Sequence, residues 1–211
     1  MKRVILTLTA SFILSSLMFG QAQIQAKRLI DFHQGYASIK TSKGWRIIDT
    51  LGNLLTKTYF ISAPGPFSEG LAVVHVKEHS YGYLDTRGEM VLDPIYERTY
   101  PFHDGIAIVK LKFGEYNTEY TNGYCAIDTK GTIVKRYGKV WVESDIKDGL
   151  ILIKKDDLYG FMDIDGRMVI FPRFSVLRHF HSGRAYALKK SKWGDTEGYI
   201  NRKGEFVIVK E

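Results

Sequence analysis

Six histidines are the residues of this chain best suited to binding a metal ion or transferring protons. His33, His103 and His181 each follow a phenylalanine at the same point of a recurring pattern. Side chains that recur with a repeat are expected to lie one unit apart instead of meeting around one ion. His75 and His79 are four residues apart, but they flank the predicted end of a strand, so no helical spacing aligns them. We therefore predict no metal site.

Four carboxylates recur in the same way. Each opens an Asp-x-x-Gly segment between two apolar runs, at Asp49, Asp85, Asp128 and Asp163. An Asp side chain accepts a hydrogen bond from the backbone two residues on, and Gly adopts positive φ without a Cβ clash. The pattern predicts a hairpin built on a type I turn with a Gly bulge. A residue repeated for turn geometry is a poor candidate for a unique general acid or base.

Other signatures of catalysis or cofactor binding are missing from the sequence. There is no Gly-x-Ser-x-Gly, no His-Glu-x-x-His and no phosphate-binding glycine loop. The segment Asp163-Ile-Asp165-Gly166 partly resembles a calcium loop, but it lacks the remaining ligands and the terminal Glu. Cys125 is the single cysteine, so no internal disulfide forms, and we expect a packed thiol there instead of a nucleophile. We predict a protein that is not an enzyme and holds no cofactor.

Aromatic residues, 13% of the chain, give the one indication of binding. Five recur at or near the start of the second strand of each unit: Trp45, Tyr81, Tyr124, Tyr159 and Trp193. A row of rings could stack on sugar rings or hold a peptide, so these five are the candidate ligand contacts. The alternative is that the rings join one unit to the next. Tyr83, Phe161 and Tyr199 are aromatic at alternate positions of the same strands, and one face of each strand must be core.

All these residues belong to one pattern, whose clearest copy runs from Phe67 to Val91. Its β-branched run Leu71 to Val76 favours a strand, Tyr81 to Leu84 a second, and Met90 begins a third. Asp93-Pro94 is then expected to stop the third strand, because Pro has no N–H to donate.

Four further copies follow the same order, each with a glycine before its first strand. These glycines, with that of the clearest copy, are Gly35, Gly70, Gly105, Gly149 and Gly183. The longer interval, in the third copy, falls around Phe113 to Asn122. The units span approximately residues 32–66, 67–101, 102–145, 146–179 and 180–211. No single unit could bury its apolar face alone, so the copies are expected to stack.

We predict one all-β domain over residues 23–211, with five units of about 35 residues that each form a three-stranded antiparallel meander. Four-stranded propeller blades commonly take about 40–45 residues, so the shorter units favour an open, curled array. A small five-bladed propeller is the alternative.

The pattern Phe-x-x-Gly-x-Ala-x-Val, followed by an aromatic-Gly pair and Ile-Asp-x-x-Gly, resembles the WG-repeat family of bacterial proteins. The similarity covers Phe32 to about Val209. The Trp-Gly pair is altered to Tyr81-Gly82 and Tyr159-Gly160, and Trp193-Gly194 stands four residues early relative to Gly198. The resemblance implies a non-catalytic repeat array, often exported, with no general ligand or active site to transfer.

The N-terminus has the form of a secretory signal peptide. Lys2 and Arg3 precede an uncharged run from Val4 to Phe19, and small residues end at Ala22. Cleavage after Ala22 is expected, with Ala26 as an alternative site, and export to the periplasm or beyond would follow. The run is borderline for spanning a bilayer, so an uncleaved anchor is the alternative. No transmembrane span is expected after cleavage.

Charge is distributed unevenly. The formal net charge is +7, and the stretch from Arg167 to Lys210 holds ten basic and three acidic residues. A basic end could favour an anionic partner, although a solvated surface is the preferred interpretation. Nucleic acid is disfavoured by the export signal.

Together these observations predict an exported, non-catalytic module that binds a cell-envelope or extracellular protein or glycan. A structural envelope spacer without a specific ligand is the alternative, and a hydrolase with an unrecognised site is the least favoured one.

Overall fold

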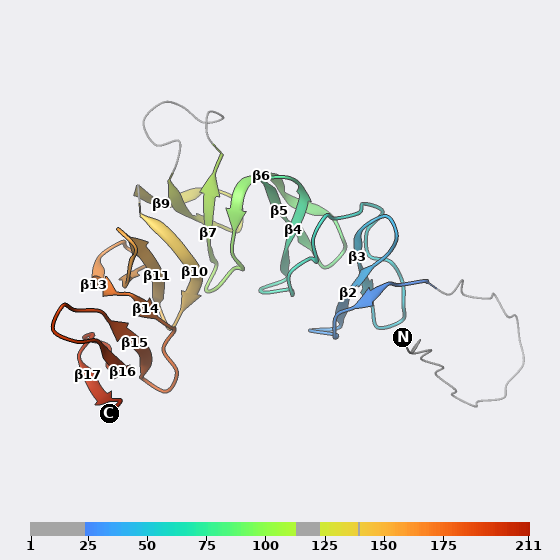
Figure 1. The fold of residues 1–211 in the computed structure, drawn as a ribbon. Coiled ribbons are helices and arrows are strands. Elements are labelled where there is room, and N and C mark those ends of the chain that lie inside the picture. The colour runs from blue at the N-terminus through green and yellow to red at the C-terminus, as the bar shows by residue number, and fades with distance from the viewer. Residues whose placement is uncertain (1–23, 113–122, 139) are drawn as a thin grey trace, which may run out of the picture.

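The computed structural model describes residues 24–112, 123–138 and 140–211 (Figure 1). Every regular element in these ranges is a β-strand. Accordingly, the described ranges hold no helix with the length and hydropathy that a membrane span requires. The predicted signal peptide and the insertion around Phe113 to Asn122 lie outside the described residues.

The strands form four antiparallel sheets that follow one another along an open arc from the N-terminus to the C-terminus (Figure 1). The first sheet contains β1 (Arg28–Leu29), β2 (Tyr36–Lys40) and β3 (Trp45–Asp49). The second contains β4 (Leu71–Lys77), β5 (Ser80–Asp85), β6 (Met90–Thr99), β7 (Ile106–Leu111), β8 (Tyr124–Asp128) and β9 (Ile133–Gly138). The third contains β10 (Trp141–Lys147), β11 (Leu150–Lys155), β12 (Leu158–Asp163) and β13 (Met168–Phe174). The fourth contains β14 (Val176–Leu177), β15 (Ala185–Lys189), β16 (Thr196–Ile200) and β17 (Phe206–Val209). The predicted all-β, open array is confirmed.

The units differ from the predicted three-stranded meander by a leading strand. β1, β10 and β14 pair with the first strand of their unit, and β6 serves two units at once. Its first part pairs with β5, and Arg98 and Thr99 at its end pair with β7. The second and third repeats therefore share one six-stranded sheet.

The expectation that Pro94 stops the third strand is wrong. The strand continues past Pro94, and its continuation forms the leading strand of the next repeat. β6 continues through Pro94 because the ladder shifts register between Leu92 and Tyr96, where a missing N–H costs no ladder bond. Pro172 occupies the corresponding place in β13, between Ile170 and Phe174. The chain thus runs from the third strand of one repeat into the leading strand of the next.

The turns have the geometry that their sequences predict. In the Asp85 turn the Gly88 N–H donates to the Asp85 carbonyl oxygen at 2.9 Å, and Asp85 Oδ1 accepts from the Arg87 N–H at 2.9 Å. Gly88 has φ +81°. The loops before the first strands are also tight, since both residues of the pair Glu69-Gly70 have positive φ, as two-residue type I′ turns require.

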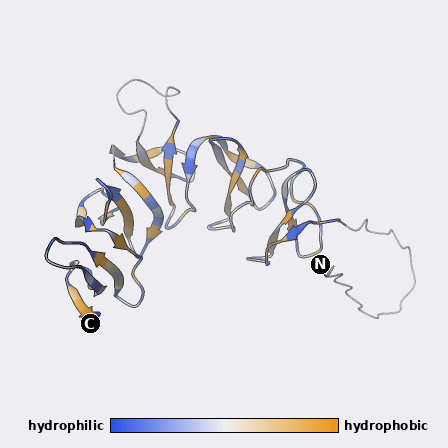
Figure 2. Cartoon of the chain, viewed as in Figure 1, coloured by the Kyte–Doolittle hydropathy of each residue, from blue (hydrophilic) through white to orange (hydrophobic). Residues whose placement is uncertain are grey.

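The internal repeats are apolar on both faces of their strands, and this arrangement generates four separate cores. In β5, Tyr83 packs toward the third repeat, whereas its neighbour Leu84 packs toward the first. The described residues contain four buried clusters, one at each boundary between consecutive repeats. Figure 2 shows the consequence, because hydrophobic residues occur along the sheets from one end of the arc to the other.

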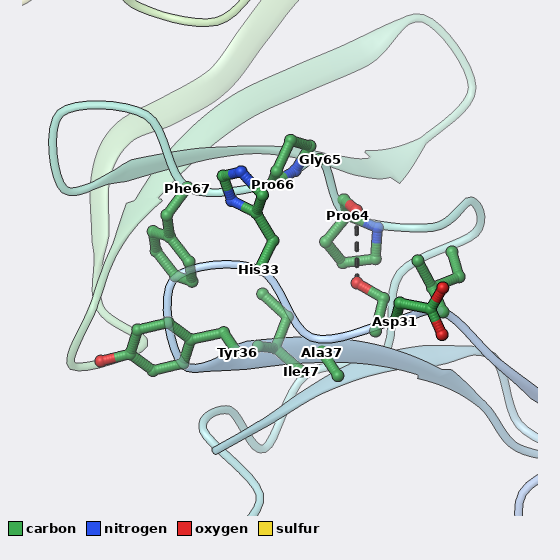
Figure 3. A pocket seen from close by; sticks show the side chains of 11 residues that line it. Asp31, His33, Tyr36, Ala37, Ile47, Pro64, Gly65, Pro66 and Phe67 are labelled. Atoms are coloured by element: carbon green, nitrogen blue, oxygen red, sulfur yellow. Dashed lines mark hydrogen bonds between the residues drawn. The ribbon is translucent and has the colours of Figure 1, made fainter. Parts of the chain in front are cut away.

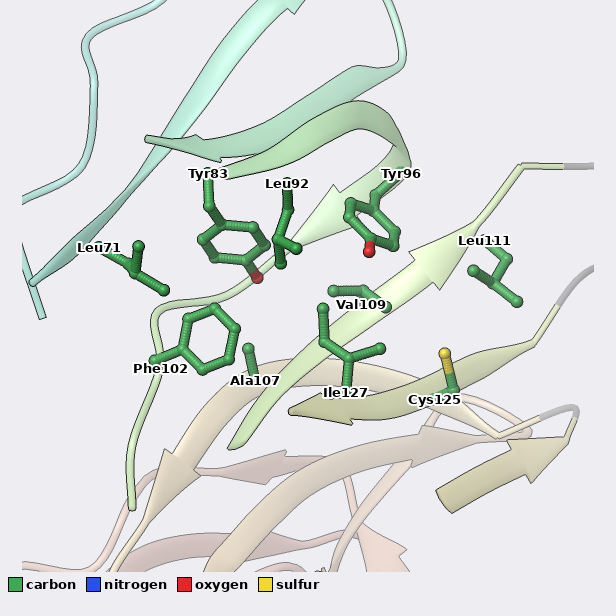
Figure 4. Packing of buried hydrophobic residues seen from close by; sticks show 10 residues of the cluster. All are labelled: Leu71, Tyr83, Leu92, Tyr96, Phe102, Ala107, Val109, Leu111, Cys125 and Ile127. Carbon is green, nitrogen blue, oxygen red and sulfur yellow. The ribbon is translucent and has the colours of Figure 1, made fainter. Parts of the chain in front are cut away.

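The phenylalanine that opens a repeat is the central contact at three of these boundaries. Phe67, Phe102 and Phe180 expose 3%, 1% and 5% of their surface. The Phe102 ring lies 4.8 Å from the Tyr83 ring of the preceding repeat (Figure 4), and the Phe180 ring lies 5.2 Å from that of Phe161. Each phenylalanine therefore docks on the sheet before it.

We predict that Phe102→Ala lowers the free energy of unfolding by about 3–5 kcal/mol, because it leaves a cavity between two sheets. Phe32→Ala changes the same position of the first repeat, where the ring is 53% exposed, and should cost less than about 1 kcal/mol. Chemical denaturation of both variants measures the difference. Equal losses would contradict docking of the phenylalanine at the boundaries.

Steric crowding requires a glycine at the second position of the aromatic-Gly pair. A Cβ on Gly160 would lie 2.4 Å from the Ile170 carbonyl oxygen, and one on Gly82 would lie 2.5 Å from that of Leu92. The third strand approaches the second too closely for any side chain at this point.

Gly160→Ala should therefore destabilise the fold by about 1–3 kcal/mol through overpacking. Gly65→Ala is the matched control, since its φ is not positive and its Cβ would meet Val73 at an ordinary 3.7 Å. We expect the control to change stability by less than about 1 kcal/mol in thermal denaturation. A harmless Gly160→Ala would show that the close approach does not matter.

Candidate binding site

The structure separates the five predicted aromatic residues instead of aligning them on one surface. Trp45 and Tyr124 are buried at 5% and 2% exposure, Tyr81 and Tyr159 are half-buried, and Trp193 is 87% exposed. No face of the described chain carries all five rings as a continuous ladder.

The two buried rings are part of the boundary cores. Trp45 belongs to the cluster between the first two repeats, with the cationic groups of Arg28 and Lys40 at 5.9 and 5.7 Å from its ring centre. Tyr124 belongs to the cluster between the third and fourth repeats, where it meets Trp141 edge-on at 5.8 Å. Burial raises the pKa of Tyr124. A ligand cannot reach these faces without separating the sheets.

The other three rings are accessible but isolated. Tyr81 stacks on His75 with ring centres 3.9 Å apart and planes within 7°. Lys154 lies 5.5 Å from the Tyr159 ring. Trp193 stands in the hairpin between β15 and β16, with the Lys192 ammonium 4.8 Å from its ring. Of the five, Trp193 alone presents most of its ring to solvent.

A hollow lies at the boundary between the first and second repeats (Figure 3). It has a volume of about 250 Å³. We call it the first-boundary cavity, and its lining residues are Ile30, Asp31, His33, Tyr36, Ala37, Ser38, Ile47, Pro64, Gly65, Pro66 and Phe67. Most of this lining is apolar.

Local structure fixes the walls of the first-boundary cavity. Tyr36 and Phe67 form an aromatic corner, with ring centres 4.6 Å apart and planes inclined by 52°. Ser38 Oγ donates to the Pro64 carbonyl oxygen at 3.2 Å, which holds the Pro64–Pro66 segment against β2 (Figure 3). The Tyr36 hydroxyl donates to the Thr86 carbonyl oxygen at 3.4 Å. Hydrogen bonds thus fix two sides of the first-boundary cavity.

The sequence interpretation did not single out these residues. The pattern Pro64-Gly65-Pro66 ahead of Phe67 was the available signal, because two prolines fix the backbone in an extended form just where a first strand is due. The recurring phenylalanine is visible in the sequence, but its neighbour across the boundary is not.

The histidines lie where the repeat spacing places them. His103 Nε2 is 3.3 Å from Asp145 Oδ2, across the boundary between the third and fourth repeats. Burial, with help from Lys147, lowers the pKa of His179. Within the described part of the chain, no group of three or more His, Cys, Asp or Glu side chains is placed to hold a metal ion.

Several basic residues of the C-terminal stretch pair with carboxylates or carbonyl oxygens. Arg167 pairs with Asp165 at 3.0 Å, Arg202 with Asp148 at 3.7 Å, and Lys210 with Glu197 at 3.2 Å. Arg173 donates to the Gly204 carbonyl oxygen at 2.9 Å. These contacts lie on different strands and turns.

Stacked antiparallel sheets with recurring boundaries define this chain as an all-β repeat protein. The family model described as "WG containing repeat" matches residues 81–112 and 159–193, which confirms the resemblance found in the sequence for these two segments. Both matched segments begin at a Tyr-Gly pair and end in or after the first strand of the next repeat. They therefore include the pairs Tyr83–Phe102 and Phe161–Phe180, so one family unit corresponds to one boundary.

Several solved structures are similar in fold alone. BamB from Moraxella catarrhalis matches with a TM-score of 0.49 and 17% identity, over 82% of this chain and 56% of that chain. A protein of unknown function from Bacteroides caccae matches with a TM-score of 0.36 and 13% identity, over 83% of this chain and 77% of that chain. Apo AztD from Citrobacter koseri matches with a TM-score of 0.35 and 14% identity, over 83% of this chain and 68% of that chain. The chain thus spans little more than half the length of the BamB structure. No curated protein matches the sequence.

Burial also sets the reactivity of the single thiol. Cys125 is 1% exposed, and burial raises its pKa to about 11. The thiolate is the reactive form, so the folded protein should resist alkylation by iodoacetamide at about pH 8 and react fully once denatured. Mass spectrometry counts the adducts. Rapid labelling of the folded chain would show an open core at the second boundary.

Stability should fall when the pH drops from about 7 to about 5. The pKa of His179 lies below its ordinary 6.5 in the fold, so the unfolded chain binds more protons over this range and unfolding becomes easier. His75 shifts in the same direction for the same reason, burial. His179→Gln should flatten the dependence, as measured by urea denaturation at each pH. An unchanged slope in this variant would show that His179 does not cause the dependence.

Proposed function

We propose that this protein is an exported, non-catalytic repeat module that binds a cell-envelope or extracellular protein partner through the first-boundary cavity. The observation that carries the proposal is the cavity itself, a hollow of about 250 Å³ with the Tyr36–Phe67 aromatic corner as its wall. A repeat array offers such a hollow on a rigid support because neighbouring sheets hold its two sides.

The chemistry of the lining favours a protein over a glycan. Apolar walls gain from burying an apolar side chain, whereas a sugar ring brings hydroxyl groups that need partners. The cavity volume suits one large apolar side chain of a partner chain. His33 and Asp31 at the lining could contact the backbone or a polar group beside that anchor.

A glycan partner has one observation in its favour. The Trp193 ring is 87% exposed in a hairpin loop, and exposed Trp rings stack on sugar faces. A structural spacer without a specific ligand is the remaining alternative, favoured by the length of the stacked array (Figure 1).

Binding screens with peptides and with glycans distinguish a protein-binding module from a glycan-binding module and from a spacer. We expect peptides with an apolar anchor to be selected from a random display library, and Ile30→Asp to weaken their binding at least tenfold by placing a charge in the cavity lining. Ile61→Asp is the matched control, since Ile61 is 55% exposed and lies outside the lining. A glycan-array signal abolished by Trp193→Ala, or no ligand in either screen, would contradict the proposal.

Export rests on the N-terminal sequence, where a basic start precedes an apolar run and small residues end at Ala22. We expect the protein isolated from its own cells to begin at Gln23 and to fractionate with the envelope or the medium. Sequencing of the N-terminus decides this. A chain beginning at Met1 in the cytosolic fraction would contradict export and leave the binding test unaffected.

A further inference from the structure

The internal boundaries share one docking arrangement. In the second repeat, Tyr83 pairs across the strands with Val73 on one side and Leu92 on the other. In the fourth repeat, Phe161 pairs with Leu152 and Ile170 in the same positions. We call such a row of three cross-strand neighbours an acceptor triplet. Each lies in the core that also contains the opening phenylalanine of the next repeat, Phe102 or Phe180.

The fifth repeat carries the same triplet with nothing docked on it in the described chain. Tyr199 pairs with Tyr186 and Ile208, which occupy the positions of Leu152 and Ile170. Tyr199 is 47% exposed and Ile208 is 59% exposed, whereas Phe161 and Ile170 are at 0% and 1%. In a stacked array an apolar face is covered by a neighbouring repeat or replaced by a polar cap, and within the described chain this face has neither.

The first repeat carries the complementary feature. Phe32 occupies the position of Phe67, Phe102 and Phe180, but it is 53% exposed because no sheet precedes it in the described chain. Its backbone setting is nevertheless the internal one. The Ile30 N–H donates to the Ser38 carbonyl oxygen at 2.9 Å, as the Tyr100 N–H does to that of Ile108 two residues before Phe102.

The two ends therefore resemble the two halves of an internal boundary. We propose that a second copy of this chain docks head to tail, with Phe32 of one molecule on the Tyr186–Tyr199–Ile208 triplet of the next. The Tyr199 hydroxyl then has a defined acceptor. Tyr83 donates its hydroxyl to the Tyr100 carbonyl oxygen at 2.7 Å, and the corresponding carbonyl at the free end belongs to Ile30 of the second copy.

This choice of occupant follows from the chain itself. Both halves of the interface are displayed on every molecule, and the same pairing is already made internally. Because the two surfaces differ, the contact is heterologous, and it propagates to rings or filaments instead of stopping at a two-fold dimer. The net charge stays positive after cleavage at Ala22, with 28 basic and 23 acidic residues, and it opposes association of like molecules. The assembly should therefore grow as salt screens that repulsion.

Sedimentation velocity of the purified protein at increasing concentration and salt tests the proposal. We expect species larger than a dimer for the unchanged chain, and monomers for Phe32→Asp and for Tyr199→Asp, each checked for native circular dichroism. Phe171→Asp is the matched control, because Phe171 is 68% exposed yet belongs to neither end face, and it should assemble normally.

Mixing the two monomeric variants gives the sharpest outcome. Phe32→Asp retains an intact triplet and Tyr199→Asp retains an intact Phe32, so the mixture should form dimers with one of each variant and nothing larger. An unchanged chain that stays monomeric under all conditions overturns the proposal. So does assembly that survives both substitutions, or a mixture that yields no dimer. Ile30 and the neighbours of Phe32 also line the first-boundary cavity, so the partner-binding test is run on the Tyr199→Asp variant, whose substitution lies at the opposite end of the chain. Peptide binding by this variant then stands or fails separately from assembly.

Discussion

The whole structure depends on the fact that the internal repeats are apolar on both faces. Tyr83 and Leu84 are adjacent in β5 and expose 0% and 1% of their surfaces, although they point to opposite sides. A short sheet of this kind cannot be stable in water alone, because one face would always remain exposed. Stacking satisfies both faces at once, and each boundary then becomes a core of its own instead of part of one central core.

Much of this architecture could be predicted from the sequence, because the same chemistry recurs at fixed intervals. The Asp85 turn and the glycine before β4 have the backbone geometry that their residue types demand. The leading strands could not be predicted from the sequence. Pro94 is a local signal for a strand end, whereas the register shift that accommodates it depends on the neighbouring strand. Strand sharing is a property of two repeats together, and a single copy of the pattern does not contain it.

The candidate site was harder to predict, because it also depends on contacts between two repeats. Trp45 and Tyr81 occupy matching sequence positions but differ in burial, because the neighbour that covers each ring is different. The first-boundary cavity arises from Phe67 and the Pro64–Pro66 segment meeting β2 across a boundary. Sequence periodicity describes what the repeats share, whereas binding surfaces form where one boundary departs from the others.

Hydrogen exchange of the folded protein tests most directly whether stability comes from the boundaries. If it does, the amides of β5, β8 and β12, which have cores on both faces, should exchange most slowly, and protection should decline toward β1 at one end and β17 at the other. Equal protection in all five repeats, or the slowest exchange in a terminal one, would mean that each repeat is stable by itself and would contradict this account.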